Sequence, residues 1–367
     1  MDLLPYLKAM VEREASDLYF SSGAAVAMKI EGNTTFVTQH ALGPGMTKSL
    51  AYSVMNDRQR AEFEREFELD MAISVEALGR FRLNVFMQRG EVALVVRYIK
   101  SAIPSVTDLQ LPTLLNDLIM APRGLILVVG TTGSGKSTTL ASMIDFRNQH
   151  RTGHILTIED PIEYIHHHKQ SIVNQREVGV DTHTFSHALR RAMREAPDVI
   201  MVGEIRDRET MQQALTYAET GHLCLSTLHA ANANKALRRI VNFFPESAHS
   251  ELFLDLSLHL QAVVSQRLLP GLHAKRVPAV EVLLTSPYVR DLIQKGEIDN
   301  IRDAMEKSTD NGMQTFDQSL LDLYHAGKIT QQTALEHADS RNNVGIKIRL
   351  EDKGTLSSTS GMTLSDD

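Results

Sequence analysis

The chain has 367 residues, 43% of them apolar and 23% charged, which suits two globular domains better than one. Its 38 lysines and arginines are outnumbered by 45 acidic residues, and the net charge of −7 argues against a surface built to hold nucleic acid. The single cysteine, Cys224, excludes a disulfide framework and a multi-cysteine zinc site.

The first hundred residues predict a small α+β domain. A short helix is expected over Leu3 to Glu12, brief extended segments follow as far as Val37, and Thr47 to Glu66 reads as helical. Three β-rich runs come next, each separated from the following one by a dipeptide that contains glycine: MAISVEA, RFRLNVFMQR and VALVVRYIK. This pattern is typical of an antiparallel meander.

The pattern changes after a segment that contains Pro104 and Pro112 and lacks periodicity. Four apolar, β-branched runs then follow: GLILVVG, HILTIED, DVIMVGE and LCLSTLH. They alternate with helical stretches at residues 136–149, 184–196, 207–220 and 232–243. This alternation predicts a buried, mainly parallel sheet with crossover helices. From Ser247 onward we expect mainly helices, interrupted by the strand PAVEVLL.

The expected fold class is therefore α/β, with a smaller α+β domain in front. We place the first domain at residues 1–102, a linker that would act as a hinge at 103–112, and the second domain with its C-terminal helices at 113–345. The Ser/Thr-rich stretch at 346–367 has few large apolar groups, so we expect it to be disordered.

A phosphate-binding loop follows the strand GLILVV. The sequence GTTGSGKS matches G-x-x-x-x-G-K-[ST] and lies between a predicted strand and a predicted helix, which makes a chance glycine-rich turn an improbable reading. Its backbone N–H groups would surround the phosphates of ATP, Lys136 would reach the β and γ phosphates, and Ser137 would bind Mg²⁺. The expected nucleotide-binding residues are Gly130, Thr131, Thr132, Gly133, Ser134, Gly135, Lys136, Ser137 and Thr138.

Acidic residues follow two further predicted strands. The strand DVIMVG ends in Glu204, where a Walker B carboxylate is expected to hold Mg²⁺ through a coordinated water. The strand HILTI is followed by Glu159, Asp160 and Glu163, at the sheet edge where ligands bind in α/β folds. Glu163 is the preferred general base and Glu159 the alternative, while Asp160 would cap the turn before Pro161; spacing alone does not rank them.

These motifs together resemble the secretion ATPase superfamily, and within it the type IV pilus retraction ATPases of the PilT and PilU types. The resemblance covers about residues 1 to 340 and rests on five stretches: GTTGSGKST, TIEDPIEYIHHH, VNQREVG, APDVIMVGEIRD and AETGHLCLSTLHAANA. The short N-terminal region and the single cysteine set the chain apart from the extension ATPases, which usually carry a tetracysteine zinc module. The segment TSPYVRDLIQKGEI matches the retraction motif only in part, and the likeness to the PilU type is the greater.

The resemblance implies a PAS-like N-terminal domain, a RecA-like ATPase domain and a hexamer in which one subunit's N-terminal domain packs on its neighbour's ATPase domain. By position, His222 and His229 correspond to the family's His box, while Arg194 and Arg206 are candidates to stabilise charge on the γ-phosphate. Three arginines on N-terminal strands could do so from a neighbouring subunit, with a surface ion pair as an equally good reading: Arg80, Arg82 and Arg97. The run His166-His167-His168 reads as structural, because successive residues on an extended chain alternate faces.

The sequence thus predicts an ATP-hydrolysing, hexameric motor that drives or assists pilus retraction, with ATP and Mg²⁺ as its ligands. Its expected partners are a PilT-type retraction ATPase and the inner-membrane platform protein of the pilus. No apolar run approaches the roughly 20 residues of a membrane span, and no signal peptide is evident, so we expect a cytoplasmic protein that acts at the inner membrane. An accessory ring with little turnover of its own is the main alternative, and a nucleic-acid translocase is a weaker one.

Overall fold

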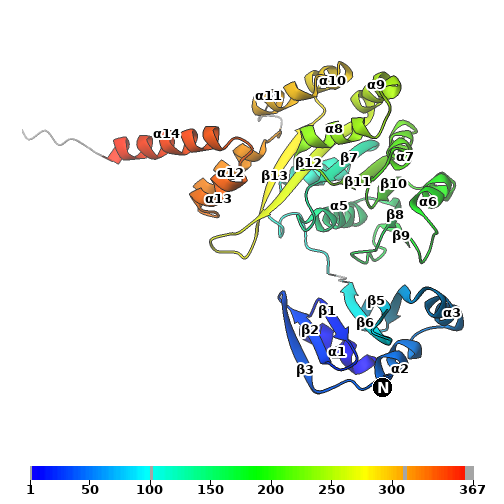
Figure 1. The fold of residues 1–367 in the computed structure, drawn as a ribbon. Helices are drawn as coiled ribbons and strands as arrows, with labels where there is room; N and C mark the ends of the chain where they lie inside the picture. Colours follow the sequence, from blue (N-terminus) through cyan, green and yellow to red (C-terminus); the bar gives the residue numbers. More distant parts are fainter. Residues whose placement is uncertain (1, 100–101, 309–311, 360–367) are drawn as a thin grey trace, which may run out of the picture. The chain divides into compact units, whose positions relative to one another are not determined.

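The computed structural model describes residues 2–99, 102–308 and 312–359 (Figure 1). The chain forms two compact units that are not contiguous in sequence. The first unit contains residues 1–103, 159–167 and 175–184, and the second contains residues 104–158, 168–174 and 185–367. Among the described residues, no helix combines the length and the apolarity needed to cross a bilayer.

The first unit is built on a six-stranded sheet with the order β3-β2-β1-β6-β5-β4. Every strand pair in it is antiparallel, which agrees with the predicted meander. Its elements are α1 (Leu4–Glu12), β1 (Asp17–Phe20), β2 (Ala25–Ile30), β3 (Asn33–Ala41), α2 (Met46–Ser53), α3 (Asp57–Glu66), β4 (Glu68–Val75), β5 (Gly79–Gln88) and β6 (Glu91–Ile99).

The core of the first unit lies between one face of this sheet and the helices. On β5 the buried residues are Phe81, Leu83 and Val85, with partly exposed residues between them, which is the alternation expected for a sheet with one buried face. Leu7 of α1 and Leu50 of α2 belong to the same buried cluster.

The second unit is built on a seven-stranded sheet with the order β13-β12-β7-β11-β10-β8-β9. Its strands are β7 (Gly124–Val129), β8 (Gly153–Glu159), β9 (Ser171–Glu177), β10 (Val199–Val202), β11 (Leu223–Leu228), β12 (Leu260–Leu269) and β13 (Val277–Leu284). The central pairs are parallel, and β13 runs antiparallel to β12. The expected α/β class with a mainly parallel sheet is confirmed.

Helices connect these strands: α4 (Leu114–Ile119), α5 (Lys136–His150), α6 (Phe185–Ala192), η1 (Met193–Glu195), α7 (Arg208–Glu219), α8 (Ala233–Asn242), η2 (Glu246–Ala248) and α9 (His249–His259). Those after the sheet are α10 (Pro287–Gln294), η3 (Ile298–Asn300), α11 (Ile301–Glu306), α12 (Phe316–His325), α13 (Gln331–His337) and α14 (Arg341–Thr359). Polar side chains define several starts; for example, Asp207 accepts a hydrogen bond from the backbone N–H of Thr210 at the first turn of α7.

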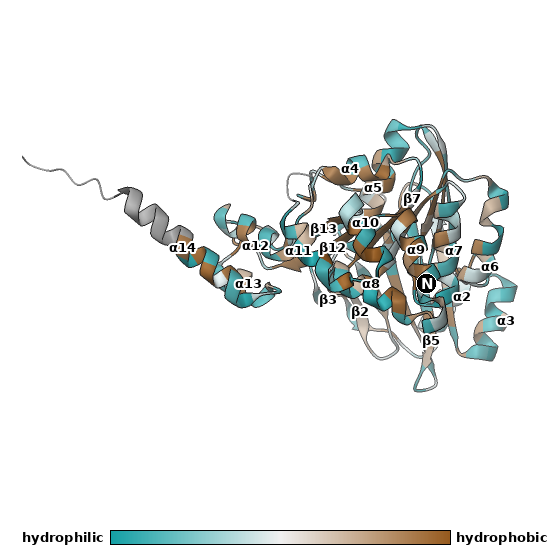
Figure 2. Cartoon of the chain, turned by 90° about the horizontal axis from the view of Figure 1, so that it is seen from above, coloured by the Kyte–Doolittle hydropathy of each residue, from teal (hydrophilic) through white to brown (hydrophobic). Residues whose placement is uncertain are grey.

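The core of the second unit explains why its strands read as continuous apolar runs. All six residues of β7 are buried, and Ile126 and Val128 share a cluster with Leu140 and Ile144 of α5. Strands covered on both faces need apolar side chains at every position. Figure 2 shows the contrast between buried strands and exposed helices: the strands of this sheet are brown, whereas helix α3 of the first unit is mostly teal.

Two expectations about the C-terminal part were wrong. Residues 260–269 form strand β12 rather than helix, because Val263 and Val264 pair with Leu127 and Val128 of β7 and are buried there. The stretch from residue 346 to 359, expected to be disordered, continues helix α14, which is anchored by Val344 and Ile348 packing with Leu321. Residues 360–367, also expected to be disordered, lie outside the described residues.

Candidate functional site

The phosphate-binding loop connects the buried strand β7 to helix α5, as the motif predicts. Gly135 has φ +92°, a left-handed conformation that favours glycine. At Gly130 there is no room for a side chain, since a Cβ would lie 2.6 Å from the carbonyl oxygen of Gln266. The loop therefore needs glycine for conformation at one end and for space at the other.

Lys136 is the first residue of α5 and is buried. Its Nζ donates hydrogen bonds to the carbonyl oxygens of Gly130 and Thr131, each at 3.0 Å. Burial lowers the pKa of this ammonium group, and the charge of Glu204 acts in the opposite direction. Lys136 is thus a cation held inside the loop by carbonyl oxygens and by one nearby carboxylate.

Glu204 follows β10 and is held by two neighbours. Its Oε2 lies 3.0 Å from Nε of Arg206, and its Oε1 lies 3.3 Å from Nε2 of His229. Burial and the charge of Lys136 lower the pKa of His229, which favours the neutral imidazole near pH 7. The structure therefore brings together four residues predicted from the sequence, namely Lys136, Glu204, Arg206 and His229.

The register of the sheet explains why these residues meet. Val129 at the end of β7 pairs with Leu228 of β11, so Gly130 and His229 emerge side by side. On the other side of β11, the hydroxyl of Thr227 donates to the carbonyl oxygen of Gly203 at 2.7 Å and fixes the turn that carries Glu204. Strand ends of a parallel sheet share one edge, and here that edge carries the charged groups.

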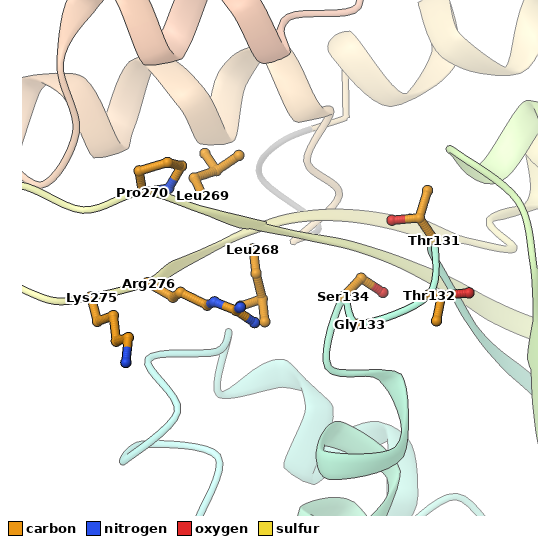
Figure 3. A pocket seen from close by; sticks show the side chains of 9 residues that line it. All are labelled: Thr131, Thr132, Gly133, Ser134, Leu268, Leu269, Pro270, Lys275 and Arg276. Atoms are coloured by element: carbon orange, nitrogen blue, oxygen red, sulfur yellow. The ribbon is translucent and has the colours of Figure 1, made fainter. Parts of the chain in front are cut away.

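A pocket of about 350 Å³ lies against the phosphate loop (Figure 3). One side of it is formed by loop residues 131–134 and the other by the end of β12 and the turn that follows. The second side contributes Leu268, Leu269, Pro270, Lys275 and Arg276. This second side could not be predicted while residues 260–269 were expected to be helical; the cationic pair Lys275-Arg276 before the predicted strand PAVEVLL was the available signal.

Residues 159–163, called the acidic segment below because they contain Glu159, Asp160 and Glu163, belong to the first unit. Glu159 ends β8 and is buried, and both of its carboxylate oxygens accept hydrogen bonds, from Nε2 of Gln175 at 3.1 Å and from the backbone N–H of Glu163 at 3.5 Å. The side chains of Asp160 and Glu163 are exposed. Glu159 is thus fixed in place, while Glu163 is open to water.

The N-terminal arginines pair with carboxylates of their own unit. Their partners are Glu177 for Arg80 at 3.7 Å, Asp70 for Arg82 at 3.3 Å and Asp17 for Arg97 at 2.8 Å. Each of these three arginines therefore forms an ion pair within the chain. Arg194 lies exposed in η1, and Arg206, the other candidate for the γ-phosphate, pairs with Glu204 as described above.

Two other histidines that the sequence singled out have structural surroundings. Nδ1 of His222 lies 3.1 Å from the hydroxyl of Thr220 and 3.3 Å from the carbonyl oxygen of Tyr217, at the end of α7. In the triple-histidine run, Nδ1 of His168 accepts from the backbone N–H of Val173 at 3.1 Å. Within the described residues, no three His, Cys, Asp or Glu side chains are grouped so that they could hold a metal ion.

The loop suits the phosphates of a nucleotide. The hydroxyl oxygen of Ser134 is buried in the loop without a hydrogen-bond partner, so it is a polar atom that a phosphate oxygen would satisfy. The surroundings also suit Mg²⁺, since Ser137 offers a hydroxyl and Glu204 a carboxylate. Magnesium at phosphate sites takes few protein ligands and completes its shell with phosphate oxygens and waters.

The chain is similar in sequence to known proteins over most of its length. Residues 3–336 match the family described as type II/IV secretion system protein. The chain is 48% identical over 364 residues to the type IV pilus ATPase PilU of Pseudomonas aeruginosa, covering 99% of this chain and 95% of that protein. It is 41% identical over 343 residues to the type IV pilus retraction ATPase PilT of the same organism, covering 94% of this chain and 100% of the relative.

A solved structure supports the same grouping. The crystal structure of the pilus retraction motor PilT with bound ADP superposes with a TM-score of 0.88 at 44% sequence identity, covering 94% of this chain and 98% of that one. Similarity over nearly the whole length means that both compact units are shared with these relatives, in addition to the nucleotide-binding loop.

Proposed function

Because this chain belongs to the type II/IV secretion system protein family, we propose that it is an ATP-hydrolysing motor of the type IV pilus system that drives or assists pilus retraction and thereby twitching motility. The chain binds nucleotide and is an ATPase, as its relatives PilU and PilT are. The observation that supports ATP hydrolysis is the meeting of Lys136 in the phosphate loop with Glu204 and His229 at one edge of the sheet, and the similarity to PilU and PilT supports the pilus role.

The chain's own residues account for the binding of MgATP. The N–H groups of residues 130–138 and the positive end of α5 would hold the phosphates, and Lys136 would leave its carbonyl partners to pair with them. Ser137 and Glu204 would hold Mg²⁺, Glu204 through water, since both of its oxygens already have neighbours. The ion supplies charge neutralisation at the phosphates.

Hydrolysis also needs a group that orients and deprotonates water. Glu163 suits this role better than Glu159, because Glu163 is exposed and both oxygens of Glu159 accept hydrogen bonds. His229 would keep Glu204 oriented, and Arg194 would stabilise charge that develops on the γ-phosphate. Catalysis of this kind consists of positioning and electrostatic stabilisation.

The finer part of the proposal concerns the assembly. The greater identity to PilU than to PilT favours a motor that acts together with a PilT-type ATPase, as a homo-oligomer of six subunits docked on the inner-membrane platform protein from the cytoplasm. The alternative is a ring that binds ATP but mainly reinforces another motor. The acidic net charge speaks against a nucleic-acid translocase, and the absence of stimulation by single-stranded DNA would remove that reading.

The first test compares ATP binding and turnover in the wild type and in two variants. Lys136→Ala should lose both nucleotide binding and turnover, because it removes the loop's cation. Glu163→Gln should keep nucleotide binding and lose about a hundredfold or more in kcat, as expected for removal of a general base. A phosphate-release assay and equilibrium binding of a fluorescent ADP analogue measure the two quantities.

Glu62→Gln is the matched control, an exposed carboxylate on α3 of the first unit that should leave both quantities unchanged. If Glu159→Gln abolishes turnover while Glu163→Gln does not, the base is Glu159. Normal nucleotide binding by the wild type with negligible turnover, both alone and in the presence of a PilT-type motor, would contradict the motor proposal and favour the accessory ring.

A further inference from the structure

Gln266 lies beside the phosphate loop although it is far from it in sequence. Strand β12 pairs in parallel with β7, with Ser265 opposite Val129. Gln266, the next residue of β12, therefore lies beside Gly130, the residue that follows β7. Gln266 has only 4% of its surface exposed, so its side chain lies within the protein against the loop.

Gln266 approaches both glycines at the ends of the loop. Its backbone carbonyl oxygen lies 2.6 Å from the position that a Cβ of Gly130 would occupy, and the Nε2 atom of its side chain lies 2.8 Å from the corresponding position at Gly135. Both distances are shorter than a carbon atom tolerates, so the loop is packed directly against this one residue. The two glycines flank loop residues 131–134, which form one side of the pocket.

The amide of Gln266 also binds the helix that follows the loop. Its Oε1 accepts a hydrogen bond from the hydroxyl of Thr139 at 2.6 Å. Thr139 lies in the first turn of α5 and is fully buried. Because a buried polar group without its partner is costly, this bond fixes the orientation of the amide and the distance between β12 and α5.

We propose that Gln266 is a positioning residue of the phosphate site, whose side-chain amide holds the Gly135 end of the loop and the first turn of α5 in the conformation that binds the phosphates of a nucleotide. The inference rests on the proposed function and assigns to β12, outside the phosphate motif, control over nucleotide affinity. The Gln266 side chain has no contact with the phosphates in this role; it acts through Gly135 and Thr139, while its backbone packs against Gly130.

The test is Gln266→Met, which keeps the length of the side chain and removes the hydrogen bond. Affinity for a fluorescent ADP analogue, measured at equilibrium without hydrolysis, should fall about tenfold, as expected when one buried hydrogen bond that orders the loop is lost. The loss in kcat/KM for ATP should come from a raised KM, with kcat changed less. Hydrogen exchange of the backbone amides of residues 130–139 should accelerate.

Gln261→Met is the matched control, because Gln261 lies on the same strand and packs against a glycine of β7, Gly124, away from the loop. It should bind ADP like the wild type. Thr139→Val removes the same hydrogen bond from the other side and decides the question if Gln266→Met does not fold. The thermal midpoint of each nucleotide-free variant should stay within about 4 °C of the wild type.

The outcomes separate the two proposals. If the wild type binds ADP and both Gln266→Met and Thr139→Val bind it within twofold of the wild type, the inference about Gln266 is overturned while the proposed function stands. A loss of thermal stability with unchanged ADP affinity would also overturn it, since Gln266 would then be merely structural. A wild type that binds no ADP would overturn the proposed function, and the inference with it.

Discussion

Glu281 on β13 is a buried carboxyl group next to the loop that follows His229. Its Oε1 accepts hydrogen bonds from the backbone N–H of Ala233 at 2.7 Å and from the hydroxyl of Ser265 at 2.9 Å, and the residue is 5% exposed. Burial raises its pKa to about 7, against the effect of these two hydrogen bonds. Since Ala233 begins α8, the carboxyl group supports the start of that helix.

Glu281→Gln should change how stability depends on pH. The folded pKa of about 7 lies above the ordinary value of 4.5, so the folded state binds more protons than the unfolded state between these values. The wild type therefore loses stability as pH rises through that window, and glutamine, which can keep both hydrogen bonds, does not. We expect the variant to gain about 3 kcal/mol relative to the wild type between pH 4.5 and pH 8.

Thermal unfolding midpoints of both proteins at pH 4.5, 6 and 8 measure this effect. The difference between variant and wild type should grow with pH, and a constant difference across the three values would contradict the assignment. Ser265→Ala serves as a comparison, because it removes one of the hydrogen bonds but leaves the titrating group in place.

At the scale of single residues, the sequence predicted the groups but not their partners. Gly130 to Ser137 could be assigned because a phosphate loop is local in sequence, and Glu204 because it ends an apolar strand. The pairing of Glu204 with His229 and Arg206 and the contact of Gln266 with the loop depend on the register between strands distant in sequence. No local pattern encodes that register.

At the scale of elements, β12 connects the sheet to the C-terminal helices through Arg267. Alternation along the strand points Arg267 to the face opposite Gln266. Its guanidinium donates to the carbonyl oxygen of Ala231 at 3.1 Å and to Oδ1 of Asp339 at 2.6 Å, and it lies 3.8 Å from the ring centre of Phe316 on α12. Burial would raise the pKa of Asp339, but the hydrogen bonds from Arg267 and Asn232 and the charges of Arg267 and Arg302 together lower it below its ordinary value.

Arg267 and Asp339 should therefore be energetically coupled. Arg267→Met retains much of the contact with Phe316 and removes the charge, and Asp339→Asn removes the other charge. Each single variant should lower stability, and the double variant should lower it by less than the sum, with a coupling of about 2 kcal/mol for a pair this well covered. Thermal unfolding of the wild type, the two single variants and the double variant completes this double-mutant cycle. If the two losses of stability simply add, the ion pair contributes nothing.

Whether a strand could be predicted depends on whether its local sequence or its tertiary pairing determines it. The buried strands β7, β8, β10 and β11 were predicted because β-branched runs alternate with helices. Strand β12 was read as helix because it follows α9 directly, at Leu260, without a turn sequence to mark the change. Its character comes from pairing with β7 and β13, which is a tertiary effect.

At the scale of the whole molecule, the proposed homo-oligomer predicts that turnover depends on protein concentration. If residues of one subunit complete the site of another, ATP turnover per subunit should rise with concentration until the assembly is saturated. Sedimentation with ADP should then show species larger than the 40.9 kDa chain.

Lys136→Ala, which should not bind nucleotide, tests whether nucleotide promotes assembly. Turnover per subunit that stays constant over a hundredfold dilution, with the protein sedimenting as a single chain throughout, would contradict the proposal.

The α/β class could be predicted from the sequence, whereas the composition of the compact units could not. Two segments from the middle of the chain, residues 159–167 and 175–184, belong to the first unit, where Glu177 pairs with Arg80. The sequence predicts a single division of the chain, at the prolines after residue 102, because composition indicates linkers but not the packing of distant segments.

This division has a consequence for recombination between relatives. A gene fusion that joins residues 1–103 of one homologue to the remainder of another would separate the first unit from two of its own segments. Arg80 would then face a position 177 inherited from a different parent. Functional chimeras should therefore require three matched exchanges, at 1–103, 159–167 and 175–184. The acidic segment and the N-terminal sheet should accordingly be inherited together from one parent.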